Sequence, residues 1–336
     1  MRPVDRPRKT KLEDLKVGMF VKLPGSWTSH NFVRSKFLIK DDTQIAKIAK
    51  SGIEVVIVDP LKSVIRPEVH KRPNYVPQKP APKPKPKPWA PPLMPEDFSA
   101  FTKDPTVAPK RKASYTYEVA LHVMDKLLKD PSVENITQFK EGVTDVVDLI
   151  LEDEETSDHL LKITSHDQHT FTHSVNVGVM SVMLAKSLYG ESSHHDMHEL
   201  GAGFFLHDLG KVNLSEDLIN KPGEFDEDER DQMQKHPLGG YQLLSDTDQL
   251  SPECKLIVMQ HHERDDGSGY PQGLVGDEIH IYSRICAITD VFDGLTSRRP
   301  HKHSLQLYDA LLLMKNEMSN KFNNEVFSEF VQLFRN

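Results

Sequence analysis

Cysteine is scarce in this sequence of 336 residues, where Cys254 and Cys286 are the two thiols. They lie far apart and form no CxxC pair, so neither a disulfide framework nor a thiolate zinc site is indicated. Long apolar runs are lacking too, since no segment reaches the ~18 uninterrupted apolar residues of a membrane span, and the N-terminus has no signal-peptide pattern. We therefore expect a cytoplasmic protein that is neither secreted nor bound to a membrane.

An excess of positive charge is also absent. The 42 Lys and Arg residues are outnumbered by 50 Asp and Glu residues, which gives a formal charge of -8. General binding to DNA is therefore not expected, although a small phosphorylated ligand needs only a local positive pocket. The length is sufficient for one large domain and a small one.

The N-terminal part, residues 1–70, is predicted to form a small α+β module. Val- and Ile-rich runs at 11–23 and 54–60 are typical of strands. The segment 41–52 between them has the apolar spacing of a short helix and ends in glycine. Residues 71–95 repeat Lys and Pro without an apolar period, which predicts an extended linker. A proline-rich ligand for a partner protein is the alternative for this segment.

Helical periodicity dominates beyond the linker, so the predicted fold class is mainly α. Connecting helices are predicted over 96–164, where apolar residues recur at spacings of three and four in 114–130 and 143–155. The segment 169–190 stays apolar over several turns and ends in glycine, so His173 is expected near the start of a buried helix.

Histidines and aspartates occur in short motifs along this helical region. Two adjacent histidines lead into a glycine-rich loop in HHERDDGSGYPQGL at 261–274, and a His-Asp pair lies upstream in FFLHDLGK. A single histidine on an apolar helix is more often a packed core residue, and chance pairs are expected among 17 histidines. The whole set indicates a metal site, because helix bundles build such sites from facing helices. The candidate ligands are His173, His207, Asp208, His236, His261, His262 and Asp290.

These residue types predict a metal-dependent hydrolase. Imidazole and carboxylate without thiolate favour iron, manganese or zinc. A carboxylate can bridge two ions ~3.5–4 Å apart, which supply hydroxide from a bridging water and stabilise charge that builds on phosphorus. Lys211 falls three residues after Asp208, on the same side of the predicted helix, and is placed to steady a phosphate oxygen or the nucleophile. A solvent-facing lysine is the alternative.

The motifs of the helical region follow one another in a fixed order. They are HS at 173–174, HDLGK at 207–211, KPGEF at 221–225, KHPLGG at 235–240, the GYP run at 261–274 and RICAITDVFDGLTSRRP at 284–300. This order resembles the HD-GYP family of the HD phosphohydrolase superfamily. The resemblance covers about residues 165–333 and implies a helical HD-type bundle over 165–336. The N-terminal block looks like the small module that often precedes such domains.

The resemblance implies a phosphodiesterase that opens cyclic di-GMP to pGpG, in some members on to GMP, and that uses iron or manganese. By position, one of two metal ions would be held by His173, His207, Asp208 and Asp290. The second would be held by His236, His261 and His262, with Asp208 bridging both. The family positions that contact the dinucleotide are matched by Lys211, Tyr270, Arg299 and Lys302.

Some positions depart from the family or take no part in the predicted site. His169 stands where members with a third metal ion carry glutamate, so two ions are expected. Arg298-Arg299-Pro300-His301 replaces the usual acidic-Arg-Pro-Tyr stretch, which adds positive charge and removes an aromatic ring. Glu263 is expected to orient a histidine rather than to bind metal. The three histidines of SSHHDMHEL, His194, His195 and His198, are expected to be solvated.

Two other functions stay open. The first is a sensor or scaffold that binds cyclic di-GMP, turns it over slowly or not at all, and signals through the N-terminal module or a partner. The second is an HD phosphohydrolase for a nucleoside phosphate or another cyclic dinucleotide, which the GYP run disfavours. The helices at 115–160 are expected either to form a homodimer interface or to pack onto the catalytic bundle.

Overall fold

The computed structural model describes residues 8–23, 36–51, 53, 55–59, 63, 93–165, 172–190, 194–247, 250–297 and 304–335. The chain divides into two compact units, Met1–Pro88 and Trp89–Asn336, and each has a hydrophobic core of its own. Nearly all of the linker predicted at 71–95 lies outside the described residues. The predicted domain boundaries therefore stay predictions.

The first unit contains an antiparallel sheet with the strand order β1-β4-β2-β3. Val21 of β2 lies opposite both Val58 of β4 and Phe37 of β3. The predicted helix at 41–52 is confirmed, and it begins where the Asp41 side chain accepts a hydrogen bond from the backbone N–H of Gln44. The elements are β1 (Arg8–Lys11), β2 (Phe20–Lys22), β3 (Lys36–Leu38), α1 (Asp42–Lys50) and β4 (Val55–Asp59).

The apolar run at 11–23 does not form one strand, as its composition had suggested. Leu12–Asp14 forms the 3-10 helix η2, and the chain then turns at Gly18, whose φ of 91° lies in the left-handed region. Within the run, Lys11 ends β1 and Phe20–Lys22 forms β2, so two separate strands of the sheet flank the turn. Charged residues interrupt the run before Gly18, so buried and exposed side chains do not alternate there as a longer strand would require.

The second unit is helical, and its first helices are longer than their apolar patterns predicted. α3 begins at Pro109 rather than at 114, because proline suits the first turn of a helix. α4 begins well before 143, where Ser132 caps it. The apolar period missed the start of α3 because Lys110, Arg111 and Lys112 fill its first turn. The start of α4 does contain apolar residues, since Ile136 and Phe139 are buried, but polar residues separate them from the dense apolar run after 143. The elements are α2 (Phe98–Lys103), α3 (Pro109–Lys129), α4 (Val133–Glu152) and α5 (Glu154–Thr164).

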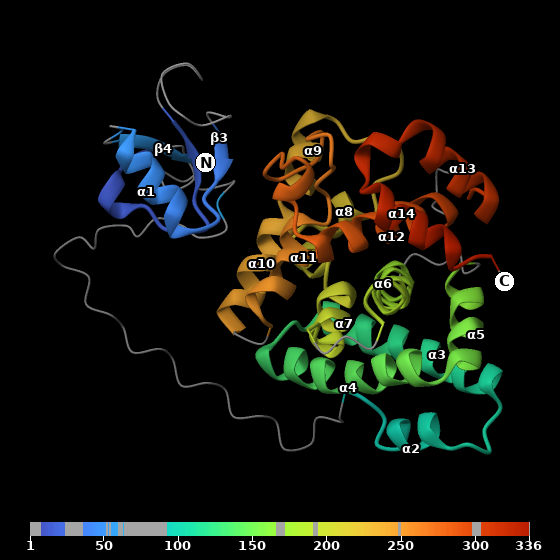
Figure 1. Ribbon diagram of the computed structural model, residues 1–336. Helices are drawn as coiled ribbons and strands as arrows, with labels where there is room; N and C mark the ends of the chain where they lie inside the picture. The colour runs from blue at the N-terminus through green and yellow to red at the C-terminus, as the bar shows by residue number, and fades with distance from the viewer. Residues whose placement is uncertain are drawn as a thin grey trace. The chain divides into compact units, whose positions relative to one another are not determined.

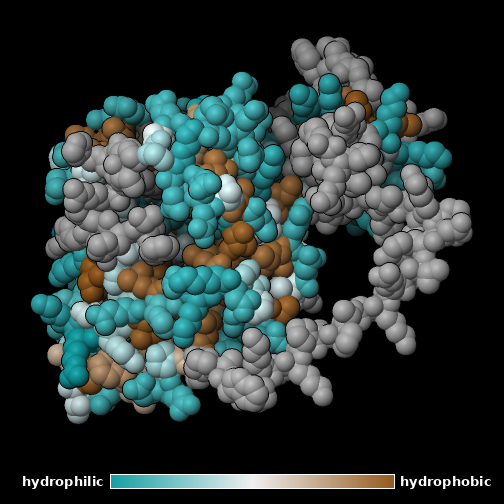
Figure 2. Space-filling model, turned by 180° about the vertical axis from the view of Figure 1, so that it is seen from behind, coloured by the Kyte–Doolittle hydropathy of each residue, from teal (hydrophilic) through white to brown (hydrophobic). Residues whose placement is uncertain are grey.

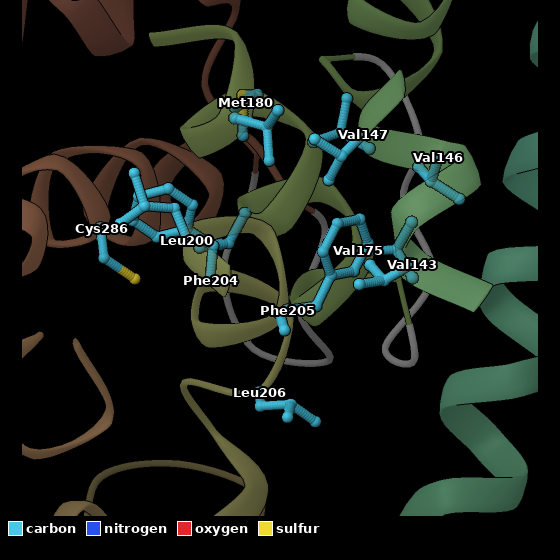
Figure 3. Close-up of a cluster of buried hydrophobic side chains, with 14 of the residues drawn as sticks. Val143, Val146, Val147, Val175, Met180, Leu200, Phe204, Phe205, Leu206 and Cys286 are labelled. Atoms are coloured by element: carbon cyan, nitrogen blue, oxygen red, sulfur yellow. The ribbon is translucent and has the colours of Figure 1, made fainter. Parts of the chain in front are cut away.

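These connecting helices pack onto the bundle, which was one of the two expected alternatives. α4 packs on α7 (Met197–Phe205), and α5 packs on α6 (His173–Tyr189), within a single core. Figure 3 shows this core, in which Val143 of α4, Val175 of α6 and Phe205 of α7 lie together. Helices α6 and α7, next to the candidate site, are thus supported by α4 and α5, which come earlier in the sequence.

Helix α6 lies at the centre of the helical unit. Figure 1 views it nearly along its axis, with α7, α12 and α14 around it. Its residues 174–185 are all buried, so this stretch has no face exposed to solvent. The remaining elements are η3 (Leu209–Asn213), α8 (Glu216–Ile219), α9 (Glu227–Met233), α10 (His236–Thr247), α11 (Pro252–Gln260), η4 (Gly276–Glu278), α12 (Ile281–Thr296), α13 (Leu307–Glu317), η5 (Ser319–Lys321) and α14 (Asn324–Gln332).

The surface of the helical unit is mostly hydrophilic on the face in Figure 2, with hydrophobic residues reaching it in places between polar ones. Among the described residues, no helix combines the length and apolar content that crossing a lipid bilayer requires. The mainly helical fold class with a small α+β part is confirmed.

Candidate metal centre

Most of the predicted ligands lie where a helix begins or ends. His173 is the first residue of α6 and His236 the first residue of α10, while His261 and His262 directly follow α11. Asp290 differs, since it lies within the buried helix α12. Four separate segments of the helical unit therefore supply these five side chains.

The His-Asp pair occupies the turn between α7 and η3 rather than a helix, and a glycine explains how close this turn comes to α10. His207 and Asp208 follow α7, and Gly210 stands at the start of η3. A Cβ at Gly210 would lie only 1.9 Å from the carbonyl oxygen of His236 and 2.4 Å from the backbone nitrogen of Gly240. Only glycine permits this approach of two backbones, and it brings Asp208 next to His236.

The ligand atoms form two groups that share Asp208. One group contains Asp208, His236, His261 and His262, and the other contains His173, His207 and Asp208; within each group all ligand atoms lie within 4.8 Å of one another. Asp290 contacts both groups, because its Oδ1 lies 3.2 Å from His173 Nε2 and its Oδ2 lies 3.4 Å from His262 Nδ1. The two groups could hold two cations, one on each side of Asp208.

The hydrogen bonds of the imidazoles fix which nitrogen faces the site. In His207, His236 and His261, Nδ1 lies 2.8–2.9 Å from the backbone carbonyl oxygen three residues earlier. A carbonyl oxygen can only accept, so each Nδ1 carries the proton and donates it. Each Nε2 is then left with a lone pair directed into the site, as a metal ligand requires.

Several of these lone pairs face other acceptors. Nε2 of His236 lies 3.2 Å from Nε2 of His261 and 3.1 Å from Oδ1 of Asp208. Oδ1 of Asp208 is buried and accepts no hydrogen bond. Buried acceptors that converge without a proton between them repel each other, so the donor set fits divalent cations.

Burial and neighbouring charges set the protonation states of the ligands. Burial lowers the pKa of His207 to about 3 and the pKa of His262 well below its usual value. Burial raises the pKa of Asp208, but the neighbouring Lys211 ammonium outweighs burial and holds the pKa well below the usual range. Neutral imidazoles and an ionised carboxylate are the forms that bind metal.

His173 is the exception among these histidines. Burial lowers its pKa, but its hydrogen bonds to Asp290 and Asp293 outweigh burial and raise the pKa to about 9. The carboxylate of Asp293 lies 2.6 Å from Nδ1 of His173 on the side away from the other ligands. A cation bound to Nε2 would therefore replace the proton on Nε2. The proton on Nδ1 would remain, hydrogen-bonded to Asp293.

The structure brings Lys211 and Asp208 together. Nζ of Lys211 lies 2.5 Å from Oδ2 of Asp208. They share one side of the 3-10 helix η3, in which residues three apart are eclipsed, and not the side of an α-helix as predicted. The Lys211 side chain is 31% exposed, so its ammonium group lies between the buried carboxylate and solvent.

The GYP loop packs directly against the two histidines. A Cβ at Gly269 would lie 2.5 Å from backbone atoms of His262, Glu263 and Arg264, so this position requires glycine. The ring of Tyr270 stacks on the imidazole of His262, with ring centroids 4.6 Å apart and planes at 30°. The loop therefore places an aromatic ring at the edge of the candidate metal centre.

The expectation that Glu263 orients a histidine is wrong. Its buried carboxylate accepts hydrogen bonds from the backbone N–H groups of Gln272 at 2.6 Å and Leu274 at 2.8 Å. It thus holds the GYP loop in place. The residue that orients a histidine is Asp293, which the sequence reasoning missed although it falls three residues after Asp290 on the same helix.

Other predicted residues stay apart from the cluster or cannot be placed. Arg299, Lys302 and His169 lie outside the described residues. His195 is not simply solvated as expected, because its ring stacks on Tyr189 with centroids 3.8 Å apart and its Nδ1 lies 2.7 Å from the Tyr282 hydroxyl. His198 has its Nε2 2.7 Å from a carboxylate oxygen of Asp148.

Comparison with known proteins matches both parts of the chain. The model of the HD domain matches residues 161–326, and that of a domain of unknown function, DUF3391, matches residues 8–135. A solved structure, an HDG"Y"P protein from Bdellovibrio bacteriovorus, shares the fold with a TM-score of 0.60, covering 98% of this chain and 100% of that one at 14% identity.

Several curated relatives are phosphodiesterases. A cyclic di-GMP phosphodiesterase of Pseudomonas aeruginosa is 28% identical over 97% of this chain and 76% of its own length. A cyclic di-GMP phosphodiesterase response regulator of Xanthomonas campestris is 43% identical over 35% of this chain. A 3'3'-cGAMP-specific phosphodiesterase of Vibrio cholerae is 35% identical over 51% of this chain. The chain spans only 32% and 39% of the lengths of the latter two.

Proposed function

The chain belongs to the HD-GYP family of HD-domain phosphodiesterases, and we propose that it hydrolyses cyclic di-GMP to pGpG. The observation that carries this proposal is the convergence of buried lone pairs around Asp208, next to a GYP loop whose tyrosine stacks on one candidate ligand. A cyclic di-GMP phosphodiesterase of Pseudomonas aeruginosa also matches almost the whole chain.

Two divalent cations, iron or manganese, would be held by the His and Asp cluster. His173, His207 and Asp290 form the proposed first site, His236, His261 and His262 form the second, and Asp208 lies between them. When bound, such a pair activates water near neutral pH and neutralises charge on the reacting phosphate. The backbone carbonyls behind three of the imidazoles hold Nδ1 of each, so that its Nε2 lone pair would be free to bind a cation.

Other residues of the chain would act on the dinucleotide. Lys211, paired with Asp208 but partly exposed, is placed to exchange that carboxylate for a phosphate oxygen when cations occupy the site. Tyr270 presents its ring for stacking against a guanine. Arg299 and Lys302, which lie outside the described residues, remain proposed phosphate contacts from their sequence positions.

Hydrolysis of cyclic di-GMP by the anaerobically reconstituted full chain tests the proposal. We expect linear pGpG from the wild type and from Asp217→Ala, a control in which an exposed carboxylate on α8 is removed. Asp208→Ala should lose at least ~1,000-fold in rate, as expected when the bridging ligand of a two-metal site is removed. A wild type that binds cyclic di-GMP without turning it over would overturn the proposal and indicate the sensor function.

A second substrate is supported by one specific observation. Relatives of 34–36% identity are 3'3'-cGAMP-specific phosphodiesterases, so the same assay should include 3'3'-cGAMP. A kcat/KM for 3'3'-cGAMP at least ~10-fold above that for cyclic di-GMP, a difference of about 1.4 kcal/mol, would assign it as the preferred substrate. A partner of the N-terminal unit, a homodimer and the cytoplasmic location stay predictions.

A further inference from the structure

We infer that Tyr117 and Asn176 are positioning residues that fix the orientation of the candidate metal ligand His173, an inference that rests on the proposed metal-binding role of His173. Tyr117 lies on α3 and Asn176 on α6, and Asp293 on α12 joins them to the histidine. Their side chains form one continuous, buried chain of hydrogen bonds that begins outside the region matched by the HD domain.

Each link of this chain has good hydrogen-bond geometry. The hydroxyl of Tyr117 donates to Oδ1 of Asn176 at 2.8 Å, and Nδ2 of Asn176 donates to Oδ1 of Asp293 at 2.8 Å. Oδ2 of Asp293 lies 2.6 Å from Nδ1 of His173. Tyr117 is 5% exposed, Asn176 is fully buried and Asp293 is 1% exposed, so water does not compete for these bonds.

The donor and acceptor groups permit only one donor-to-acceptor direction along this chain of hydrogen bonds. A carboxylate accepts and cannot donate, so Asn176 must turn its NH₂ group toward Asp293 and leave its oxygen facing α3. A donor is needed there, and the Tyr117 hydroxyl supplies it. At the other end, the carboxylate requires a proton on Nδ1 of His173, which leaves the Nε2 lone pair for a cation.

The orientation of His173 depends on this chain of hydrogen bonds, whereas three other candidate ligands are oriented by their own backbone. Nδ1 of His207, His236 and His261 donates to a backbone carbonyl only three residues away. Nδ1 of His173 relies instead on a side chain from another helix. Loss of the Tyr117 hydroxyl would leave the Asn176 oxygen buried without that donor, so the amide could rotate and turn its oxygen toward the Asp293 carboxylate.

The test compares Tyr117→Phe with a matched control in the full chain. Tyr115→Phe removes a hydroxyl from the same helix, where it lies 3.4 Å from a carboxylate oxygen of Asp97 and contacts no part of the cluster. Metal-free wild type and both variants are titrated with Mn²⁺ by calorimetry, and the unfolding temperature of each metal-free protein is recorded.

We expect Tyr117→Phe to weaken one of the Mn²⁺ sites by roughly 3- to 10-fold, below the 10- to 100-fold effect of a group that contacts the ligand directly. The other site, the unfolding temperature without metal and the KM for cyclic di-GMP should match Tyr115→Phe. The loss of kcat at limiting Mn²⁺ should be restored by saturating Mn²⁺.

A second variant tests the same chain of hydrogen bonds at its central residue, Asn176. Asn176→Asp is nearly isosteric but replaces the amide donor with a carboxylate that repels Asp293, so we expect a larger loss at the same site. Wild-type affinity at both sites in both variants would overturn the inference, as would a uniform loss at both sites that follows a lowered unfolding temperature. A wild type that binds no Mn²⁺ would overturn the proposed metal site itself, and this inference with it.

Discussion

At the scale of single residues, the buried carboxylate of Glu263 shows how one side chain shapes the substrate side of the site. It accepts backbone N–H groups from two positions of the GYP loop, and Tyr270 lies on the same loop. Its partners are nine and eleven residues along the chain, so the path of the loop had to be known before this role was visible. The sequence suggested a histidine as its partner only because two histidines precede it.

Replacement of Glu263 by glutamine should therefore act on substrate binding. Glutamine has one acceptor oxygen where the carboxylate has two, and its NH₂ would face a backbone N–H, so the loop loses order. We expect the KM for cyclic di-GMP to rise roughly 10-fold, since a buried hydrogen-bonding group left without its partner costs about 1–3 kcal/mol. Steady-state kinetics measures this.

Glu278→Gln is the control for that change, because Glu278 also accepts a backbone N–H in this region, from Val275 at 3.0 Å, but is less buried. Its KM should stay within about twofold of the wild type. An unchanged KM in Glu263→Gln would contradict the role assigned to the carboxylate.

The two cysteines are expected to be unreactive in the folded protein. Burial raises the pKa of Cys254 to about 12 and the pKa of Cys286 well above its usual value. Both thiols therefore stay protonated at pH 8, and the thiolate is the form that reacts. A colorimetric thiol reagent should label neither cysteine in native protein at pH 8 and both in guanidinium. Rapid labelling of the native protein would contradict the buried, neutral state.

At the scale of elements, the site depends on the backbone contact between η3 and α10. A methyl group at Gly210 would overlap the His236 carbonyl oxygen, and the two elements would have to separate. Gly210→Ala should lower the free energy of unfolding by about 1–3 kcal/mol, as overpacking does, and weaken metal binding. Denaturant unfolding and metal titration measure the two effects.

The neighbouring glycine of α10 provides the comparison. A Cβ at Gly239 would lie 3.1 Å from the side-chain amide of Asn213, which can move aside, and at the ordinary contact distance of 3.7 Å from the carbonyl oxygen of Gly210. Gly239→Ala should therefore keep the metal affinity and leave stability unchanged or slightly raised, since alanine favours a helix by about 1 kcal/mol over glycine. Equal effects in the two variants would argue against the close contact.

Element by element, the sequence was most informative where one local signal determined the outcome. The apolar helix that starts at His173 and ends before Gly190 was recognised because it is buried on all sides and has a glycine stop. Pro109 begins a helix whose first turn is polar, so the apolar period missed it. Ser132 caps α4, whose early apolar residues Ile136 and Phe139 are set among polar ones and were missed too. Asp293 was missed because its partners, His173 and Asn176, are more than a hundred residues earlier.

At the scale of the whole molecule, each of the two units has its own hydrophobic core. The candidate metal centre belongs entirely to the second unit, in which helices before the matched HD domain pack onto the bundle. Cations that bind the folded helical unit should therefore stabilise that unit alone.

Removal of metal should lower the unfolding temperature of the helical unit selectively. Each cation at 100 times its dissociation constant adds about 2.7 kcal/mol, or about 5.4 kcal/mol for two, which corresponds to roughly 11–22 °C for a unit of this size. Calorimetry of the full chain with and without chelator measures the shift, and a transition of the N-terminal unit should stay in place. Identical traces in both conditions would show that the cations do not bind the folded state.

The metal content of the purified chain tests the central claim most directly, which is that the His and Asp side chains around Asp208 hold a pair of cations. Protein reconstituted anaerobically with Fe²⁺ or Mn²⁺ and then desalted is measured by plasma mass spectrometry. We expect about two ions per wild-type chain and loss of both in Asp208→Asn, which keeps the shape of the side chain but removes the bridging charge. A wild type without bound transition metal, or an Asp208→Asn variant that keeps both ions, would contradict the claim.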